Sequence, residues 1–128
     1  DEEKNEVREI FESFGKAEFV GENMMDVVAG VSGSSPAYVY MFIEALADGA
    51  VLQGMPRQQA YTFAAQAVLG SARMVLETGM HPGALKDMVC SPGGTTIEAV
   101  ASLEQDGLRA AVIRAVDVCT EKSKAMSK

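Results

Sequence analysis

The sequence predicts an all-α fold, and three observations support that prediction. Ala, Val, Met and Leu are frequent, whereas aromatic residues are few and Trp is absent, a composition that favours closely packed helices. From residue 23 onward the apolar pattern is helical, with breaks at Gly and Pro. No long stretch is dominated by strand-forming residues. With 128 residues, the chain has the size of one domain.

Residues 1–22 depart from this pattern. Residues 2–14 predict a helix that Gly15 ends, and its apolar side chains share one face: Val7, Ile10, Phe11 and Phe14. Residues 16–22, KAEFVGE, predict a short strand that has no sheet to join. The chain also opens without Met, inside a charged helical stretch. We therefore expect residues 1–22 to be the remnant of a sheet-containing domain and the chain to be a piece of a longer protein.

Two helices are predicted over residues 23–54. Residues 23–30, NMMDVVAG, form a short apolar helix that closes near Gly30. The next helix has Ser35 as its N-cap and Pro36 at its first position, where the missing N–H costs nothing, and it ends at Gly54. Its residues 37–43 are apolar on every side, so they must be buried all round or lie in a subunit interface. We expect an interface, because few other elements exist to surround them.

The rest of the chain predicts four more helices. Pro56 restarts a helix that runs to about Glu77, with Gly79 just past its end. Its alanines keep side chains small where neighbouring helices approach: Ala60, Ala64, Ala67 and Ala72. A short helix opened by Pro82 follows, then one over residues 95–107, which Gly107 ends. The last helix runs from residue 108 to about 125 with an apolar stripe: Leu108, Ala111, Val112, Ala115, Val118 and Cys119.

Charge and cysteine usage exclude several function classes. The net charge of −7 argues against nucleic acid as a partner, because such sites need clustered Lys and Arg. Glu44 and Asp48 lie inside the most apolar run and argue against a membrane span. Cys90 and Cys119 are isolated, so neither a metal site nor a disulfide framework is indicated, and a reducing cytoplasm fits best. Cys119, on the apolar stripe, is expected in the core.

Two side-chain pairs could carry chemistry but have simpler structural interpretations. His81 and Cys90 could form a nucleophile pair, yet no third orienting residue is indicated and a histidine before proline more often opens a helix. Glu44 and Asp48 could act in acid/base catalysis, yet such a pair more often forms the solvated or salt-bridged edge of a helix. We favour the structural interpretation of both pairs.

Residues 90–99, CSPGGTTIEA, contain the strongest candidate site. Thr95 and Glu98 have the spacing of a capping box, in which each side chain satisfies a backbone N–H at the helix start. Gly93 and Gly94 would then only provide a turn. The same glycines could instead let consecutive N–H groups converge on a carboxylate or phosphate at the positive end of the helix. The spacing favours the cap and leaves the anion site open.

Three motifs, taken in order, resemble one family. Residues 32–60 (SGSSPAYVYMFIEALADGAVLQGMPRQQA), 81–89 (HPGALKDMV) and 91–116 (SPGGTTIEAVASLEQDGLRAAVIRAV) are similar to the C-terminal half of the pyrroline-5-carboxylate reductases. The resemblance covers essentially the whole chain. It implies a helical dimerisation and substrate-binding domain over residues 23–128, related to the C-terminal domain of 6-phosphogluconate dehydrogenase, after the end of a dinucleotide-binding, Rossmann-type domain over residues 1–22.

The resemblance also implies an assembly and a reaction. Two such helical domains interlock as a homodimer, and dimers often associate into rings. The active site lies between the nucleotide domain of one subunit and the helical domain of its partner. There 1-pyrroline-5-carboxylate, a cyclic imine bearing a carboxylate, is reduced to proline by hydride from NADPH or NADH.

The site residues implied by the resemblance lie on the glycine-containing loop. The loop that holds the substrate carboxylate matches five residues: Ser91, Gly93, Gly94, Thr95 and Thr96. Backbone N–H groups around Gly94 and Thr95 would bind the anion, and the hydroxyl of Thr96 would lie near the imine nitrogen as the catalytic group. Val89 and Cys90 would help to wall the nicotinamide side.

Two departures from the family pattern have consequences. Ser35 replaces the second glycine of the usual SGSGPAY; a serine can cap the helix, but its side chain limits any close approach of the cofactor there. No G-x-G-x-x-G follows a strand in this chain, so we expect no reductase activity from it alone. The alternative function is a non-catalytic helical homo-oligomerisation module, which would not bind proline at the loop.

Overall fold

A computed structural model describes residues 2–5 and 19–127 of the chain, and within these ranges it contains helices and no strand. The all-α prediction is therefore confirmed. The elements that precede the first long helix are η1 (Glu22–Met24), α2 (Met25–Val28) and η2 (Ala29–Gly33). The remaining helices are α3 (Ser35–Leu52), α4 (Arg57–Thr78), α5 (Pro82–Met88), α6 (Thr95–Gln105) and α7 (Leu108–Met126).

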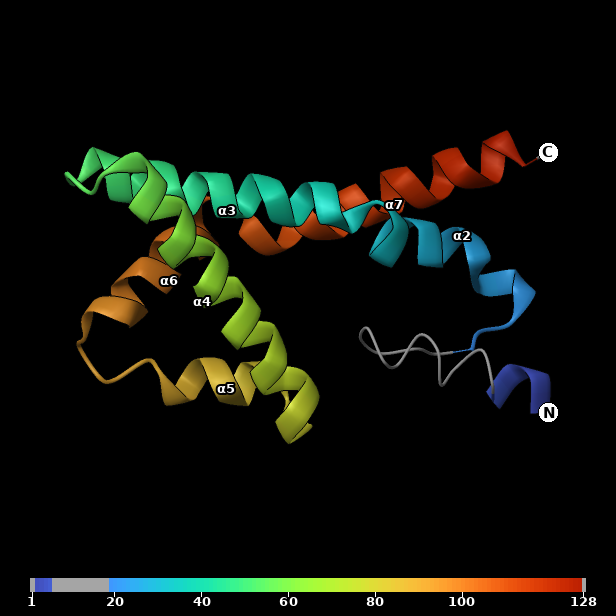
Figure 1. Cartoon of the computed structure of the whole chain (residues 1–128), viewed down its shortest axis with the longest axis horizontal. Helices are drawn as coiled ribbons and strands as arrows, with labels where there is room; N and C mark the ends of the chain where they lie inside the picture. Colours follow the sequence, from blue (N-terminus) through green and yellow to red (C-terminus); the bar gives the residue numbers. More distant parts are fainter. Residues whose placement is uncertain (1, 6–18, 128) are drawn as a thin grey trace.

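The helices form an open frame around a helical hairpin (Figure 1). The helix α4 folds back from the end of α3 and descends at an angle to it, α5 runs back beneath, and α6 leads into α7 (Figure 1). The segment η1–α2–η2 contacts α7 near its C-terminal end, on the side of the molecule opposite the turn between α5 and α6 (Figure 1). The predicted breaks at Gly54, Gly79 and Gly107 are confirmed, since all three adopt positive φ.

The hairpin α3–α4 holds the small core of the chain. Ala47 of α3 packs against Ala60 and Ala64 of α4, and larger side chains cover them: Ile43, Val51 and Met55. Small side chains let the two helices approach closely, as predicted for Ala60 and Ala64. Ala67 and Ala72 are exposed, because α4 has by then diverged from α3, so the prediction stays untested there.

An ion pair and a ring contact brace the end of the hairpin. Arg57 donates a hydrogen bond to Asp48, and its guanidinium lies over the ring of Tyr61, 5.6 Å from the centroid. The hydrogen bond with Asp48 is the main reason why the pKa of Arg57 is raised above its ordinary value. The predicted salt-bridged edge of α3 is therefore confirmed at Asp48, while Glu44 is exposed on the same helix.

The predictions for residues 16–33 were wrong in two respects. Residues 19–21 are not a strand and Glu22 begins a 3₁₀ turn, since no second strand is present in the described ranges to pair with them. Residues 16–18, and most of the helix predicted over 2–14, lie outside the described residues. The short helix does not close at Gly30 either, because the backbone continues into a π-helical turn in which Ser34 N–H donates to Ala29 O at 2.8 Å.

Gly30 is a packing residue and not a stop. It is buried against α7, where an added Cβ would lie 2.7 Å from Oγ1 of Thr120 and 3.0 Å from the carbonyl oxygen of Val116. The glycine therefore allows a close approach between η2 and α7. The sequence alone does not distinguish a glycine that ends a helix from one that allows another helix to pack closely against it.

The start of α3 also differs from the prediction by one residue. Its N-cap is Ser34, and Ser35 is the first helical residue. The Ser34 hydroxyl makes no capping bond and accepts a hydrogen bond from the thiol of Cys119 at 3.2 Å. Ser34 has helical dihedral angles (φ −102°, ψ −20°) and not the extended ones of a usual N-cap. Cys119 is only half-buried, between α7 and the α3 start, which corrects its expected place in the core. The backbone enters α3 directly from the preceding π-helical turn, so the start of α3 has no side-chain cap of the usual kind.

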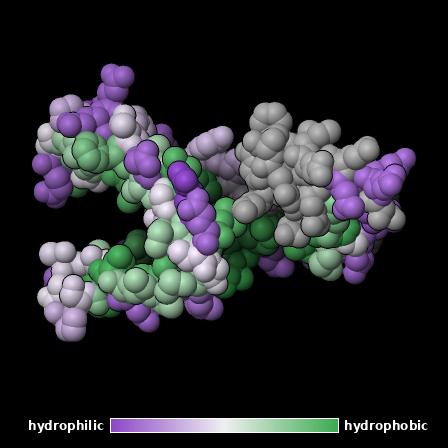
Figure 2. All heavy atoms as spheres, turned by 60° about the horizontal axis from the view of Figure 1, so that its bottom comes forward, coloured by the Kyte–Doolittle hydropathy of each residue, from purple (hydrophilic) through white to green (hydrophobic). Residues whose placement is uncertain are grey.

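The chain covers little of its apolar surface by itself. No large side chain is fully buried among the described residues, and the accessible surface of the chain is 10162 Å². A compact monomer of 13.6 kDa exposes about 6,600 Å². In the stretch predicted to be an interface, Tyr40 and Met41 are each 69% exposed. Apolar side chains lie open to solvent between the hydrophilic tips of the molecule (Figure 2).

The apolar stripe predicted on α7 is likewise uncovered within one chain. Leu108, Val112 and Val118 are exposed, whereas the face of α7 that contacts η2 and α2 carries Val116, Thr120 and Ser123. The predicted apolar residues do lie along α7, but most of them are not buried within this chain. They add to the surface that a partner would have to cover.

Candidate functional site

The loop between α5 and α6 is a tight turn that requires glycine. Gly94 N–H donates to Ser91 O at 3.0 Å, so that Pro92 and Gly93 occupy the two central positions of a β-turn. Gly93 adopts φ +68°, in the left-handed region, after a proline whose φ is fixed near the value that a type II turn needs. The Pro-Gly pair thus fixes the direction in which the chain enters α6.

The capping box predicted for Thr95 and Glu98 does not form. The N-cap of α6 is Gly94, in an extended conformation (φ −83°, ψ −179°), and Thr95 is already helical. Glycine has no side chain with which to cap, and within the described residues no other side chain bonds to this helix start. The N–H groups of Thr95, Thr96 and Ile97 therefore have no intrahelical acceptor and no cap, which favours the anion-site interpretation.

The donors differ in one respect from those implied by the family resemblance. The N–H of Gly94 is engaged with Ser91 O in the turn, so the open donors begin at Thr95. Gly94 also lets the turn close tightly, since a Cβ there would lie 3.2 Å from Ser91 O. Ser91, Gly93, Thr95 and Thr96 are exposed, and the structure thus brings the predicted binding residues together on one accessible turn.

A shallow hollow of about 430 Å³ lies beside this turn. Its lining residues come from the turn and the first two turns of α6: Gly93, Gly94, Ile97, Glu98 and Ala101. Glu98 contributes a carboxylate, and an anion would have to bind on the side of the helix start away from it. One chain supplies only one wall of this site. A small ligand needs a more enclosed place to be held firmly.

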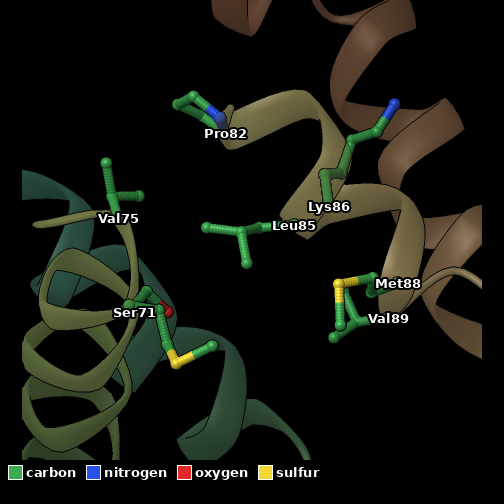
Figure 3. A pocket seen from close by; sticks show the side chains of 8 residues that line it. Ser71, Val75, Pro82, Leu85, Lys86, Met88 and Val89 are labelled. Carbon is green, nitrogen blue, oxygen red and sulfur yellow. The ribbon is translucent and has the colours of Figure 1, made fainter. Parts of the chain in front are cut away.

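A second, apolar cavity of about 390 Å³ lies between α4 and α5, before the turn (Figure 3). Leu85 points across it toward α4, opposite Ser71 and Val75, and Met88 and Val89 close one end (Figure 3). Sequence reasoning missed this cavity, because its lining residues are spread over two helices. Val89, predicted to wall the nicotinamide, lines it and is also exposed, and Cys90 beside it is half-buried.

His81 and Cys90 do not form a nucleophile pair. His81 Nδ1 accepts a hydrogen bond from Gly83 N–H at 2.9 Å and so caps the start of α5. Cys90 follows the other end of that helix, whose seven residues span about 10 Å. The interpretation of His81 as a residue that opens a helix is confirmed.

The described residues show neither a metal cluster nor a long apolar helix. Within residues 2–5 and 19–127, no three His, Cys, Asp or Glu side chains gather to hold a metal ion. In the same ranges, no helix has the length and hydropathy needed to cross a bilayer.

Polar contacts between α7 and the start of the helical region were not predicted. Ser123 Oγ donates to Asp26 Oδ1 at 2.6 Å, across 97 residues of sequence. The Tyr38 phenol has a pKa above its ordinary value, first because of desolvation and then because of a hydrogen bond with Cys119. No spacing rule could have found these pairs, because tertiary packing alone brings α7 against residues 25–38.

Comparison with known proteins places this architecture in one family. The model of the pyrroline-5-carboxylate reductase dimerisation domain matches residues 22–126. The pyrroline-5-carboxylate reductase of Escherichia coli K12 is 69% identical over 127 residues, which are 99% of this chain and 47% of that protein. That of Methanosarcina acetivorans is 58% identical over 120 residues, 94% of this chain and 44% of the relative. The chain thus spans about half of the length of these curated relatives.

Solved structures agree with the sequence matches. The Coxiella burnetii pyrroline-5-carboxylate reductase superposes with a TM-score of 0.91 at 36% identity, over 100% of this chain and 48% of that one. The Plasmodium falciparum pyrroline carboxylate reductase, solved with NADP bound, gives a TM-score of 0.87 at 39% identity, over 98% of this chain and 48% of its own.

Proposed function

Since this chain belongs to the pyrroline-5-carboxylate reductase family, we propose that it is the dimerisation and substrate-binding part of an enzyme that reduces 1-pyrroline-5-carboxylate to proline. Residues 23–128 form this part, and residues 1–22 end the nucleotide domain that binds NADPH or NADH. The enzyme works in the cytoplasm as a homodimer or a ring of dimers.

The uncapped start of α6 is the observation on which this proposal depends. The N–H groups of Thr95, Thr96 and Ile97 point out of a helix start that has no capping side chain, directly after a turn stiffened by Pro92 and Gly93. Such a helix start attracts a carboxylate through its backbone donors and the helix dipole. It can do so in a chain of net charge −7 without a Lys or Arg at the loop.

The exposed apolar surface supports dimerisation. The chain exposes roughly 3,600 Å² more than a compact monomer of its mass would, which is more than the about 1,000–2,500 Å² that each partner buries in an obligate dimer interface. The uncovered residues of α3 and α7 are the surfaces that a second copy would cover. The same observation supports the second candidate function, a non-catalytic oligomerisation module, which differs in binding nothing at the loop.

The position of the loop supports an active site shared between subunits. Residues 19–24 lie on the side of the molecule opposite the turn between α5 and α6 (Figure 1). A nucleotide domain attached before residue 22 therefore lies far from the loop of its own chain. The loop of the second copy completes the site, and it supplies the enclosure that the open hollow in one chain lacks.

The residues of this chain bind and orient the substrate. The open N–H groups hold the carboxylate, and this fixes the position of the ring relative to the helix. The Thr96 hydroxyl lies next to the imine nitrogen, accepts a hydrogen bond from the protonated imine and so keeps the electrophilic carbon facing the cofactor. The nicotinamide supplies the hydride, and Val89 and Cys90 exclude water from that side.

Substitution of Thr96 tests this role. In the full-length enzyme we expect Thr96→Ala to lower kcat/KM at least tenfold, about 1.4 kcal/mol of transition-state stabilisation, and Thr96→Ser to restore most of it. A kcat/KM within twofold of the wild type for Thr96→Ala would remove Thr96 from the mechanism. Proline titrations followed by amide NMR separate the two candidate functions, because only the reductase predicts shifts at residues 95–97.

The chain by itself should be inactive. Without a G-x-G-x-x-G after a strand it has no means of binding the dinucleotide as the family does. Reduction of the imine by the purified 128-residue chain with NADPH would contradict the division of labour between the two parts.

A further inference from the structure

A row of contacts, two of them hydrogen bonds, joins the first helical segment, residues 22–33, and the adjoining Ser34 to the C-terminal half of α7. Ser123 Oγ donates to Asp26 Oδ1 at 2.6 Å, the length of a charge-assisted hydrogen bond. One turn earlier on α7, Thr120 lies against Gly30. Next to it the Cys119 thiol lies 3.2 Å from Ser34 Oγ. These α7 residues are spaced three and four apart, so they share one face of the helix.

Large apolar side chains do not bury this attachment, although Gly30 fits closely against Thr120 and Val116. No large side chain is fully buried within the described residues, and Met24, Met25 and Val31 of the segment are all more than 40% exposed. The segment also passes from 3₁₀ to α to π geometry within twelve residues. A helix of this kind can change its register by one residue, a rotation of about 100°. The close fit of Gly30 and the hydrogen bond between Ser123 and Asp26 together hold the segment in one register on α7.

The register matters because of what is attached to the segment. Everything that precedes residue 22 is joined covalently to the rest of the chain through residues 22–33 alone. The bond between Asp26 and Ser123 lies about four residues from that junction. A small rotation of the segment on α7 consequently moves the whole preceding domain relative to the helices.

We propose that Asp26 and Ser123 form a positioning pair for the reductase reaction. Their hydrogen bond fixes the segment on α7 and thereby the angle at which the preceding domain presents its hydride donor to the substrate at the loop. This inference rests on the proposed function. A misplacement of about 1 Å at the reacting atoms costs on the order of 100-fold in rate, so an angular change at a distance from the site is enough.

The pair acts on the chemical step and not on substrate binding. The loop that holds the carboxylate lies on the opposite side of the molecule from α2 (Figure 1). Loss of the hydrogen bond therefore lowers kcat and leaves the affinity of the loop for a carboxylate unchanged. A defect in folding would change both, together with the dimer.

The test is Ser123→Ala in the full-length enzyme, with Ser127→Ala as the matched control. Ser127 lies one turn further along α7, and its hydroxyl bonds only to carbonyl oxygens of its own helix, those of Ser123 and Lys124, at 3.2 Å. We expect Ser123→Ala to lower kcat at least fivefold, with KM for the imine and the inhibition constant of proline within twofold. Ser123→Thr, which keeps the hydroxyl, should restore kcat, and Ser127→Ala should leave it unchanged.

Hydrogen exchange gives a readout that does not depend on activity. Amides of residues 24–34 should exchange at least fivefold faster in Ser123→Ala than in the wild type, while those of α4 should not change. Asp26→Asn, which keeps the shape of the side chain, should act in the same direction and add little to Ser123→Ala in the double variant.

The outcomes separate this inference from the proposed function. If the wild type is active and Ser123→Ala changes kcat by less than twofold, the positioning pair is refuted and the reductase function is not. The same conclusion follows if Ser123→Thr or Ser127→Ala lowers kcat as much as Ser123→Ala does. A dimer lost in Ser123→Ala also overturns the positioning pair, since the role is then structural. If the wild-type enzyme does not reduce the imine, the reductase function is refuted. If the amides of residues 24–34 then exchange at the same rate in Ser123→Ala as in the wild type, the attachment of the segment to α7 is refuted too.

Discussion

Gly93 and Gly94, adjacent in the sequence, are required for different reasons. Gly93 has a positive φ of 68° and open space around it, so its requirement is conformational. Gly94 has an ordinary extended conformation, but its missing side chain leaves the start of α6 uncapped and accessible. A glycine pair was predicted to act at this loop, and the dihedral angles assign the two roles.

Gly93→Ala should therefore destabilise the chain through backbone conformation alone. We expect a loss of about 1–2 kcal/mol in the free energy of unfolding, since an L-residue pays that amount in the left-handed region. Gly70→Ala is the matched control, because Gly70 lies inside α4 with nothing within 4 Å of an added Cβ. That substitution should stabilise the chain by about 0.5–1 kcal/mol. Chemical unfolding of the three proteins measures both values, and equal effects of the two substitutions would contradict the assignment.

Tyr38 should make the stability sensitive to high pH. The fold raises the pKa of its phenol above 10.0, first through desolvation and then through the hydrogen bond with Cys119. A raised pKa means that the folded state favours the neutral phenol. This contribution is fully present below the unfolded value of about 10 and is lost as the pH rises through the folded value.

The comparison of wild type with Tyr38→Phe isolates this effect. Between pH 9 and pH 11 the wild type should lose more of its free energy of unfolding than the variant does, as measured by urea unfolding at each pH. Parallel losses in the two proteins would mean that the ionisation of Tyr38 does not oppose folding.

At the scale of elements, α6 begins without a side-chain cap at the place where we propose that the substrate carboxylate binds. A side-chain cap would satisfy one of the N–H groups that the helix leaves open at its start, and the chain has Gly94 there. Ser91 O uses the Gly94 N–H, which holds the turn, while the donors from Thr95 onward stay open. A capping side chain at position 94 would make α6 more stable, and the chain has none at the point where we expect the ligand.

Gly94→Ser should separate stability from binding at this helix start. The serine hydroxyl can cap α6, while its Cβ must relieve a 3.2 Å contact with Ser91 O, so we expect the free energy of unfolding to stay within about 1 kcal/mol. Proline binding should fall at least tenfold, because the hydroxyl occupies the donors. Calorimetric titration of the full-length enzyme measures the affinity, and unaltered proline affinity would place the carboxylate elsewhere.

At the scale of the whole molecule, this chain buries too little of its apolar surface by itself and needs a second copy to cover the rest. Its core consists of three alanines with a few side chains over them, and Tyr40 and Met41 of α3 remain mostly exposed. The hairpin α3–α4 is well defined by local packing, yet the frame around it is open. The total surface that the chain exposes beyond that of a compact monomer is large enough for one side of an obligate dimer interface.

A charge in the exposed face of α3 should therefore prevent assembly. We expect Tyr40→Asp to convert the dimer to monomer, because a carboxylate would be buried in an apolar interface without a partner. Its Tm should fall and no longer depend on protein concentration, whereas the Tm of the wild type should rise with concentration. Sedimentation gives the mass, with Gln53→Asp at the exposed end of α3 as the control. A dimeric Tyr40→Asp protein would exclude this face from the interface.

Local patterns predicted most of the helices and the glycine turn that carries the candidate site. Proline, glycine and helical spacing gave α3, α4, α5 and α7 to within one or two residues, because these signals act through the backbone of a few neighbouring residues. The same signals failed where a distant element intervenes. Gly30 lies inside a continuing helical stretch and packs against Thr120, and the hydroxyl of Ser34 accepts a hydrogen bond from Cys119 while making no capping bond to α3.

The sequence by itself determined an all-α chain, its order of helices and a glycine turn suited to a small anion, since each depends on residues close together along the chain. Only the tertiary structure decided that α6 starts uncapped, that the segment of residues 22–33 is attached to α7 through Asp26 and Ser123, and that the apolar faces of α3 and α7 stay open. These features depend on which distant surfaces meet. The free energy of such contacts comes from packing and hydrogen bonds between elements, which no local pattern records.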